Sequence, residues 1–595
     1  MNRRFANFGL PLLAKELIEQ AARKRTYIVR VVYAVILFLL TGLFFYQILQ
    51  FAVASPLAVL GRGRDMFATL VGVQFAGVYL FMPAMTCGVI TQEKERASLQ
   101  LLFLTRLGPW TILFEKLLGR LVPMLGFLVL SIPLLGFAYT LGGVSRDFLW
   151  TGVWLLVLAS IQMGSVALMC SAYFRTTVGA FIGSYVLAFL MMFGPYFIAM
   201  ILYLVALLAG ADLERLLREI APSLSPDMFM LGMFPLFGPM LFFVAAMLPG
   251  ALGGWLILGH SVIVLAVSGG CLLLARRFLV RRAFLPPRNI VLDAFRRIDR
   301  AQLQQARAES SAQAAALSAA RLPGDEPIAW RETSKRLLGR GRYVFRILLF
   351  IEVPLVLFCL LLIAKSDNFA TEILSSMMLF LVWMLSVLVV SVKAASLIAG
   401  ERSHQTLDVL CTTPLTSREI VLQKFRGVLR LILVLAVPML TIYLFNARLR
   451  IVSIRFRGPE FDPLKYLFCG ILAVGVYLPL VAWVSLAIGL RVRTQVRAMI
   501  GSLAALVAWC IGPLIFITMP LAIMLRPMPR DDLPAYSALL SPATMVFMNE
   551  VTQTEPVNAP PAIVVNFIGY GIALVVIRAV CLSNADRWLG RCEAK

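Results

Sequence analysis

Two short stretches of the sequence carry the same pattern of charged and polar residues. Residues 93–99 (Glu-Lys-Glu-Arg-Ala-Ser-Leu) align without a gap with residues 401–407 (Glu-Arg-Ser-His-Gln-Thr-Leu), and the match continues to one lysine in each copy, Lys116 and Lys424. Leucine matches are common by chance in such an apolar sequence, but glutamate and lysine matches are not. Their side chains form ion pairs and charge-assisted hydrogen bonds. The pattern therefore predicts a place of contact rather than a reaction centre.

The residues that we expect to carry this contact are the acidic and basic residues that open each stretch, a hydroxyl residue, two leucines and the trailing lysine. They are Glu93, Lys94, Ser98, Leu99, Leu102 and Lys116 in the first copy, and Glu401, Arg402, Thr406, Leu407, Leu410 and Lys424 in the second. The leucines have helical spacing, so a short helix is predicted in each stretch. Thr416 and Glu419 have the spacing of a capping box, which predicts that the next helix begins there. The two stretches, 93–108 and 401–416, are called the charged segments below. The alternative for each is a solvated loop helix without a partner.

Helices that span a membrane must position these segments, because apolar residues dominate the sequence. Of the 595 residues, 60% are hydrophobic and only 14% are charged, with a mean hydropathy of +0.87. A soluble protein of this length would need more charge to cover its surface. We therefore predict an all-α polytopic membrane protein with about twelve transmembrane helices. The predicted spans are 31–46, 66–91, 121–142, 148–174, 177–209 and 252–280, followed by 345–364, 375–400, 428–447, 466–490, 498–525 and 562–582.

The two halves of the chain are predicted to be direct six-helix repeats. The matching residues are Pro11, Glu16, Tyr27 and Arg30 with Pro327, Glu332, Tyr343 and Arg346, and a Leu-Ser-Pro sequence at 224–226 and 540–542. Both copies start and finish on the same side of the membrane, so the repeat is direct rather than inverted. The predicted organisation is a first unit at 1–280, a basic and Ala/Gln/Ser-rich cytoplasmic linker at 281–326, a second unit at 327–582 and a cytoplasmic tail at 583–595.

Each copy opens with a short amphipathic element before its first span. Such a helix can lie in the plane of the membrane interface, with its charged residues near the headgroups. The residues expected there are Glu16 and Arg30 in the first copy, and Glu332 and Arg346 in the second. A helix that only orients the first span is an equally good alternative. Between the fifth and sixth predicted spans, Met228–Leu248 is apolar but broken by prolines, which favours a re-entrant or interfacial hairpin.

The charge balance is strongly basic, with 55 Lys and Arg against 31 Asp and Glu and a net charge of +24. Most of the basic residues fall in loops that the predicted spans place on one side, as the positive-inside rule requires of the cytoplasmic side. We therefore expect a multi-pass protein of the plasma (cytoplasmic) membrane, with both termini cytoplasmic and no nucleic-acid partner. Five basic residues fit poorly, since they would lie in an outer loop: Arg448, Arg450, Arg455, Arg457 and Lys465.

The sequence lacks the motifs of an enzyme. It has no phosphate-binding Gly-x-x-x-x-Gly-Lys-(Ser/Thr) loop, so any ATP hydrolysis is expected in a partner subunit. The histidines are only His260 and His404, and the nine cysteines lack Cys-x-x-Cys spacing. We therefore expect no catalytic residue, no metal site and no cofactor. Glu352 and Lys393 are the main ionisable residues within predicted spans, which is too few for the proton or ion relay of a secondary transporter.

The charged segments resemble the cytoplasmic segment of ABC-2-type permeases. The similarity lies in Glu-(Lys/Arg)-x-x-x-(Ser/Thr)-Leu-x-x-Leu-x-x-Thr-x-Leu, followed by Lys116 or Lys424. The second copy is the closer match, because the first has Ser98 and Arg106 where threonine and proline are usual. The resemblance implies that two six-helix permease units, here fused in one chain, pair into a translocation path. It also implies that the charged segments dock on two separate cytosolic nucleotide-binding ATPase subunits, that transport is export, and that short re-entrant helices follow the Leu-Ser-Pro sequences.

Two other functions stay open on the sequence. One is a secondary transporter, and the other is a membrane scaffold or assembly component that transports nothing itself. The spans are uniformly rich in Leu, Val, Phe and Ala, so no charged or aromatic pocket identifies a substrate. The sequence therefore predicts the lipid bilayer and the ATPase subunits as partners and leaves the substrate unknown.

Overall fold

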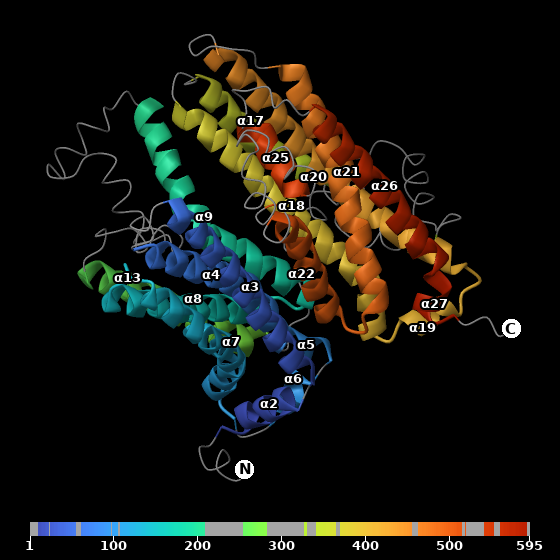
Figure 1. The fold of residues 1–595 in the computed structure, drawn as a ribbon. Helices are drawn as coiled ribbons and strands as arrows, with labels where there is room; N and C mark the ends of the chain where they lie inside the picture. The colour runs from blue at the N-terminus through green and yellow to red at the C-terminus, as the bar shows by residue number, and fades with distance from the viewer. Residues whose placement is uncertain are drawn as a thin grey trace. The chain divides into compact units, whose positions relative to one another are not determined.

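Long apolar helices make up both parts of the chain, which the computed structural model divides into two units, residues 1–285 and 286–595 (Figure 1). No strand occurs among the residues that the structure describes, and eleven of the described helices are long and apolar enough to cross a membrane. The predicted all-α polytopic membrane fold is therefore confirmed. The described residues are 10–22, 24–54, 61–96, 98–104, 107–208, 254–282, 327–329, 341–364, 369–454, 462–514, 518, 541–551 and 560–591.

Unit 1 begins with a short helix and then contains six of the eleven candidate spans. Its described helices are α2 (Pro11–Ala21), α3 (Lys24–Ala54), α4 (Gly63–Thr86), α5 (Gly88–Glu95), α6 (Leu99–Phe103), α7 (Pro109–Thr140), α8 (Arg146–Tyr173), α9 (Thr177–Leu208) and α13 (Gly254–Arg282). Helices α4 and α5 follow each other with a break at Cys87, four residues after Pro83. Cys87 keeps helical dihedrals and donates its N–H to the Pro83 carbonyl at 2.9 Å, so α4 and α5 form one continuous candidate span, Gly63–Glu95.

Unit 2 contains the other five candidate spans. Its described helices are α17 (Gly341–Ala364), α18 (Phe369–Ser403), α19 (Leu407–Cys411), α20 (Ser417–Ile454), α21 (Pro463–Arg491), α22 (Gln495–Pro513), α25 (Pro542–Val551), α26 (Pro560–Ser583) and α27 (Ala585–Leu589). Helix α17 covers the span predicted at 345–364 but is not among the eleven. Helix α25 has ten residues, too few to cross a bilayer, and it begins within the second Leu-Ser-Pro sequence.

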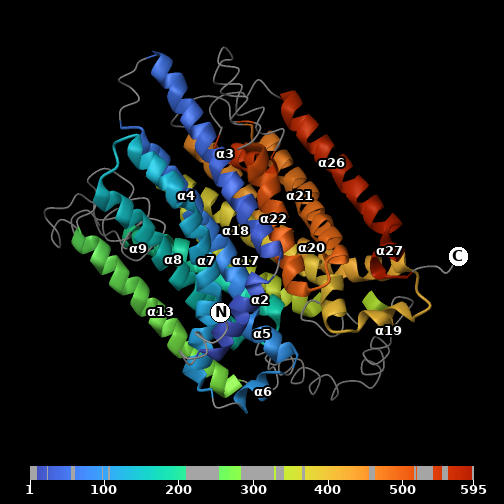
Figure 2. The same cartoon turned by 60° about the horizontal axis from the view of Figure 1, so that its bottom comes forward.

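One helix in each unit packs on several neighbours at once. Helix α8 contacts α4, α7, α9 and α13, and α21 contacts α18, α20, α22 and α26 (Figures 1 and 2). Small residues let helices approach closely in a membrane. A Cβ on Gly489 of α21 would overlap the Ala395 carbonyl of α18, and one on Gly152 of α8 would press on the Phe67 ring. The C-termini of these two central helices reach the charged segments and help to position them.

Some predicted features lie outside the described residues. These are the hairpin at Met228–Leu248, most of the linker at 281–326, and Glu332. The predicted tail at 583–595 is described as far as residue 591. Within it, α27 buries Ala585 and Leu589 in the core of unit 2. The packed part of unit 2 therefore includes residues beyond 582.

Candidate functional site

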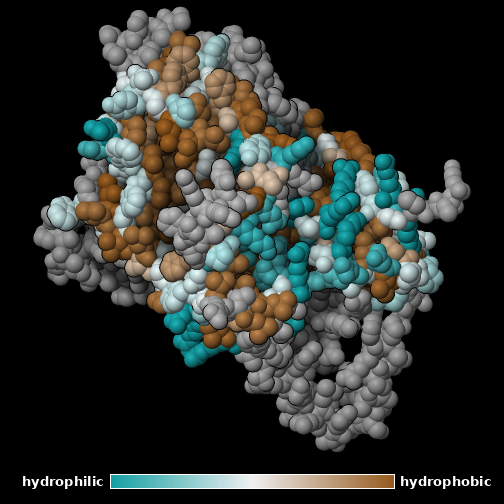
Figure 3. Space-filling view, turned by 90° about the horizontal axis from the view of Figure 1, so that it is seen from below, coloured by the Kyte–Doolittle hydropathy of each residue, from teal (hydrophilic) through white to brown (hydrophobic). Residues whose placement is uncertain are grey.

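The charged segments lie between the second and third long helices of their units. In unit 1 the segment runs from the last turn of α5 through α6 to α7, and in unit 2 it runs from the last turn of α18 through α19 to α20. The short helices predicted from the leucine spacing are confirmed, and α6 and α19 occupy aligned positions. Helix α19 lies near α27, and hydrophilic side chains gather on the face of unit 2 where these two helices lie (Figures 2 and 3).

In unit 2 an ion pair joins the start of the charged segment to the long helix that follows it. Glu401, in the last turn of α18, places Oε1 2.7 Å from the Lys424 ammonium on α20. Its Oε2 accepts a hydrogen bond from the Thr406 hydroxyl, and the Thr406 backbone N–H donates to the Glu401 carbonyl at 3.0 Å. The Lys424 side chain is only 3% exposed, so water screens this pair weakly. The repeat pattern selects Glu401, Thr406 and Lys424 separately, and the structure brings them together in a single cluster.

Unit 1 contains the same cluster with one more acid. Glu93 lies 3.6 Å from the Lys116 ammonium, and the Ser98 hydroxyl donates to the second Glu93 carboxylate oxygen. Lys116 also pairs with Glu16 of α2 at 3.0 Å, and the other Glu16 oxygen lies 3.7 Å from the Arg120 guanidinium. Glu16, which was expected only in an interfacial helix, therefore also ties α2 to α7 beside the charged segment.

Lys94 joins the charged segment of unit 1 to the end of a central helix. Its ammonium donates to the backbone carbonyls of Ser171 at 3.2 Å and Phe174 at 3.1 Å, and also to that of Ala172. The last carbonyls of a helix have no partner within the helix, and the negative end of the helix dipole favours a cation there. Lys94 thus caps α8.

Arg402, the residue aligned with Lys94, caps α21 in the same way. Its Nη1 donates to the carbonyls of Leu490 and Val492, both at 3.1 Å. Its Nη2 donates to the Trp588 carbonyl at the end of α27, at 2.7 Å. The guanidinium offers more donors than an ammonium in a fixed fork, so it reaches a third element of unit 2.

The leucines of the predicted site face the interior of their units. Leu99 and Leu407 are buried, and the other two pack beside them: Leu102 partly buried in unit 1 and Leu410 buried in unit 2. These leucines hold α6 and α19 in place. Leu104, directly after α6, is 82% exposed. On the short helices themselves, the apolar residues that point outward are Leu101 and Val409, which are 66% and 67% exposed. They occupy aligned positions, and the sequence pattern alone did not separate them from their buried neighbours.

The predicted capping box at the start of α20 is confirmed. The Thr416 backbone N–H donates to Glu419 Oε2 at 2.9 Å, and the Glu419 backbone N–H donates to Thr416 Oγ1 at 3.3 Å. In unit 1 the corresponding helix begins at Pro109 after Gly108, which has no side chain to cap it. The two charged segments therefore end differently.

A longer alignment of the two copies would have found further residues of the site. Residues 174–180 (Phe-Arg-Thr-Thr-Val-Gly-Ala) match 492–498 (Val-Arg-Thr-Gln-Val-Arg-Ala), and 271–281 (Cys-Leu-Leu-Leu-Ala-Arg-Arg-Phe-Leu-Val-Arg) match 581–591 (Cys-Leu-Ser-Asn-Ala-Asp-Arg-Trp-Leu-Gly-Arg). Both matches lie at the ends of helices that contact a charged segment or its cap.

Arg591, in the second of these matches, holds the loop that follows α19. Its Nε donates to the Cys411 carbonyl at 3.1 Å and its Nη2 to the Thr413 carbonyl at 2.9 Å. Its Nη1 donates to the Leu415 carbonyl. The charged segment of unit 2 is therefore held from both sides, by Arg402 at its start and by Arg591 at its end.

Unit 2 also buries an ion pair at the far end of α20. Arg450 Nη2 lies 2.6 Å from Glu550 Oε2, and the two side chains are 3% and 0% exposed. Glu550 also accepts hydrogen bonds from the hydroxyls of Tyr466 at 2.5 Å and Ser376 at 3.0 Å. Arg450 was one of the five basic residues that fitted the predicted topology poorly, and its charge is neutralised inside the protein.

The remaining predicted residues do not join these clusters. Arg30 lies on α3, where its guanidinium approaches Gly126 of α7, and Arg346 lies on α17. The part of the chain that the structure describes contains no group of three or more His, Cys, Asp or Glu side chains placed to hold a metal ion. No model of a protein family matches the chain, and no match was found among curated proteins.

Proposed function

We propose that the chain is the membrane-spanning permease of an ATP-driven, ABC-type exporter of the plasma membrane, with both termini cytoplasmic. In this proposal two separate cytosolic ATPase subunits act on the two charged segments. The observation that supports it most strongly is that both segments are tied to three long helices by equivalent contacts. Each has a Glu–Lys pair to the next helix and a cation bound to the end of a central helix.

The anchoring residues and the outward residues have different roles in this proposal. Glu93 and Glu401 are paired inside the chain, so they fix the segment rather than meet a partner. Leu101 and Val409 lie on the outer side of α6 and α19, each next to charged or polar residues. An exposed apolar residue inside a polar rim is a typical contact for a partner protein. The proposal therefore assigns the partner contact to these two residues.

Transport would follow from movement of the segments, since the chain has no phosphate-binding loop of its own. ATP binding would bring the two partner subunits together and push on both segments. Because Lys94 and Arg402 bind the ends of α8 and α21, a displaced segment would move the central helix of its unit. A rigid connection of this kind suits force transmission better than a mobile loop.

The test uses the full chain purified with a candidate ATPase, with co-purification and stimulated ATP hydrolysis as readouts. We expect Leu101→Asp combined with Val409→Asp to lower stimulation by about tenfold or more, as loss of a central interface contact does. Both residues are exposed, so the unfolding temperature should stay near that of the unchanged protein. Leu464→Asp is the matched control, because Leu464 is 77% exposed at the opposite end of unit 2.

A second variant tests the anchoring of the charged segments separately from their contact with the partner. Glu93→Lys combined with Glu401→Lys should lower stimulation and also increase hydrogen exchange in both charged segments, since each segment loses the carboxylate that pairs with Lys116 or Lys424. Unchanged assembly and stimulation in the Leu101 and Val409 variant would refute the coupling role. Transport that resists ATP depletion but stops with an uncoupler would instead identify a secondary transporter.

A further inference from the structure

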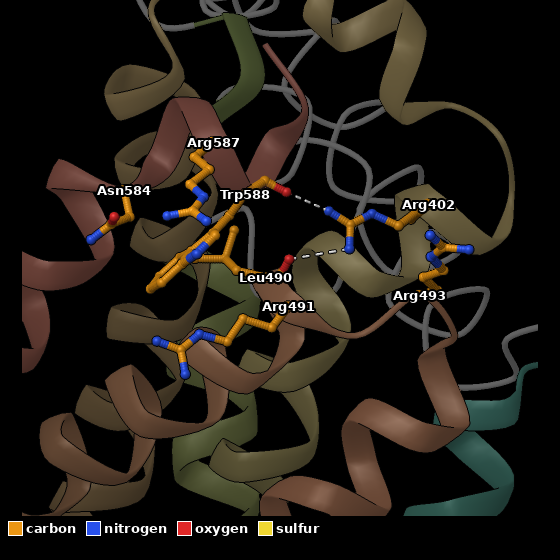
Figure 4. Close-up of a pocket in the computed structure, with 7 residues that line it drawn as sticks. All are labelled: Arg402, Leu490, Arg491, Arg493, Asn584, Arg587 and Trp588. Carbon is orange, nitrogen blue, oxygen red and sulfur yellow. Dashed lines mark hydrogen bonds between the residues drawn. The ribbon is translucent and has the colours of Figure 1, made fainter. Parts of the chain in front are cut away.

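A basic pocket of about 860 Å³ opens at the end of unit 2 that carries the charged segment (Figure 4). It is formed by the end of α18, by the end of α21 with the loop after it, and by α27 with the residue before it. Its lining residues are Arg402, Leu490, Arg491, Arg493, Asn584, Arg587 and Trp588. Four of these seven residues are arginines and none is acidic, so the pocket favours an anion.

The positive charge of this pocket is largely unneutralised. The Arg402 guanidinium donates its hydrogen bonds to backbone carbonyls. The Arg491 guanidinium lies over the Trp588 ring, 4.5 Å from its centroid. Within the described part of the chain, no carboxylate forms an ion pair with Arg491, Arg493 or Arg587. Guanidinium groups that line one hollow repel each other unless an anion enters it. Their planar donors match the oxygens of a phosphate group particularly well.

The level of the pocket along the helices identifies the source of the phosphate. Arg491 is the last residue of the span Pro463–Arg491, and Asn584 follows the span Ile563–Ser583 directly. Tryptophan and arginine are characteristic of this level, where apolar spans meet the headgroups. On the preceding turns of α26, Val576 and Val580 are 51% and 40% exposed. The pocket thus offers cations for a headgroup next to an apolar surface on which acyl chains can lie.

The corresponding place in unit 1 has a different chemistry. By the alignments above, Tyr173 stands where unit 2 has Arg491, and Phe278 stands where it has Trp588. The two rings pack edge to face with their centroids 5.0 Å apart. An aromatic pair therefore replaces the stacked arginine of unit 2. Arg175 and Arg277, which align with Arg493 and Arg587, remain in unit 1 and provide a natural control.

We propose that this pocket binds the phosphate-bearing headgroup of an anionic membrane lipid. Arg493 and Arg587 lie on opposite sides of the pocket and attract the anionic headgroup into it, while the acyl chains follow the exposed valines of α26 (Figure 4). Because Arg402 lines the pocket and also begins the charged segment, a bound headgroup neutralises the repulsion around it and stabilises segment 401–416. Basic pockets between transmembrane helices are a known way of recognising anionic headgroups.

The test is native mass spectrometry and thermal unfolding of the full chain with added phosphatidylglycerol, with phosphatidylcholine of the same acyl chains, or with inorganic phosphate. We expect phosphatidylglycerol to bind and to raise the unfolding temperature more than either of the others. Arg493→Gln combined with Arg587→Gln should weaken this binding by about tenfold or more, since each cation near the membrane surface adds a similar amount to the binding of anionic lipid. Arg175→Gln combined with Arg277→Gln in unit 1 removes the same charge and should leave binding unchanged.

Hydrogen exchange of residues 401–416 provides a readout that requires no variant. These residues should exchange more slowly with phosphatidylglycerol than with phosphatidylcholine. Equal effects of the two lipids, or equal weakening by both pairs of substitutions, would overturn the proposal. An equal effect of inorganic phosphate would show that the pocket takes free anions and would overturn the assignment to a lipid. None of these results depends on an ATPase partner, so failure here is distinct from failure of the transport function.

Discussion

The two units hold their charged segments with equivalent contacts, but the helices that follow these segments, α7 and α20, end differently on the opposite side of each unit. At the segment, both use a Glu–Lys pair, a hydroxyl bound to the glutamate and a cation on the end of a central helix. At the other end, α7 stops at Thr140 and turns into α8 through Gly142 and Gly143, both with positive φ. In unit 2 the aligned helix α20 continues to Ile454 and buries an ion pair there.

This difference separates the contacts that both units share from those that are described in unit 2 alone. The contacts present in both copies are those that fix the charged segment to the bundle. Features described only in unit 2 are the Arg450–Glu550 pair, the carbonyl contacts of Arg591 and the basic pocket. They tie short elements, α19, α25 and α27, to the long helices. The comparison therefore concerns the residues that the structure describes in both units, and three predictions test it.

The largest effect is expected at the buried ion pair of unit 2. Glu550→Gln keeps the shape of the side chain but removes the carboxylate that neutralises Arg450, whose side chain is 3% exposed. Loss of one partner from a buried pair costs about 3–5 kcal/mol. The measurement is the free energy of unfolding in mixed detergent, with hydrogen exchange to show that α25 and the end of α20 are the parts released.

A double variant is the control for this prediction. Arg450→Met combined with Glu550→Gln removes both charges, and about half or more of the lost stability should return, because no unpaired charge is left. The helices of unit 1 should exchange at their original rate in both variants. A single Glu550→Gln variant as stable as the unchanged protein would show that the pair contributes little.

A smaller effect is expected at the lysines of the two charged segments. Lys424→Met removes the ammonium that lies 2.7 Å from Glu401, and we expect a loss of about 2–3 kcal/mol for this partly buried pair. Lys116→Met should cost less, about 1–2 kcal/mol, because Glu16 keeps Arg120 and Glu93 is more exposed. Hydrogen exchange of 401–416 and 93–108 measures each loss separately. Equal losses of stability in the two variants would mean that Glu16, the additional acid of unit 1, does not compensate for the loss of Lys116.

The smallest effect is expected where the segments end. Thr416→Ala breaks the capping box of α20 and should cost about 1 kcal/mol. Gly108→Ser, at the aligned end in unit 1, supplies a side-chain cap where the backbone is already extended, and should add a few tenths of a kcal/mol. Exchange of the first turn of α20 and α7 is the measurement. If Thr416→Ala stabilised the first turn of α20, or Gly108→Ser destabilised that of α7, the helix cap would not account for a difference between the units.

The sequence predicted those parts of the fold and site that depend on local pattern. Hydropathy located the long helices, and the repeated leucines located α6 and α19. The Thr416–Glu419 cap was predictable because its two residues are three positions apart. The repeat also selected Glu401 and Lys424 without showing that they pair with each other.

The remaining contacts could not be predicted because at least one partner carries no local signal. Lys94 and Arg402 bind backbone carbonyls, which every residue has. Arg450 and Glu550 are 100 residues apart and meet only through the packing of α20 against α21 and α25. Leu101 and Leu102 look alike in sequence, and only the way α6 sits on the bundle makes one exposed and the other partly buried.

The contacts of Arg591 have a consequence for the order in which the protein matures. The loop after α19 is synthesised 176–180 residues before the arginine that holds it. At ordinary translation rates this interval lasts roughly 10–40 s. During that time α20, α21, α22 and α26 must be inserted while the segment lacks its last contact. The segment therefore reaches its final form only after Arg591 has been synthesised, so that a partner recognising the held segment would select chains that extend past Arg591 over shorter nascent ones.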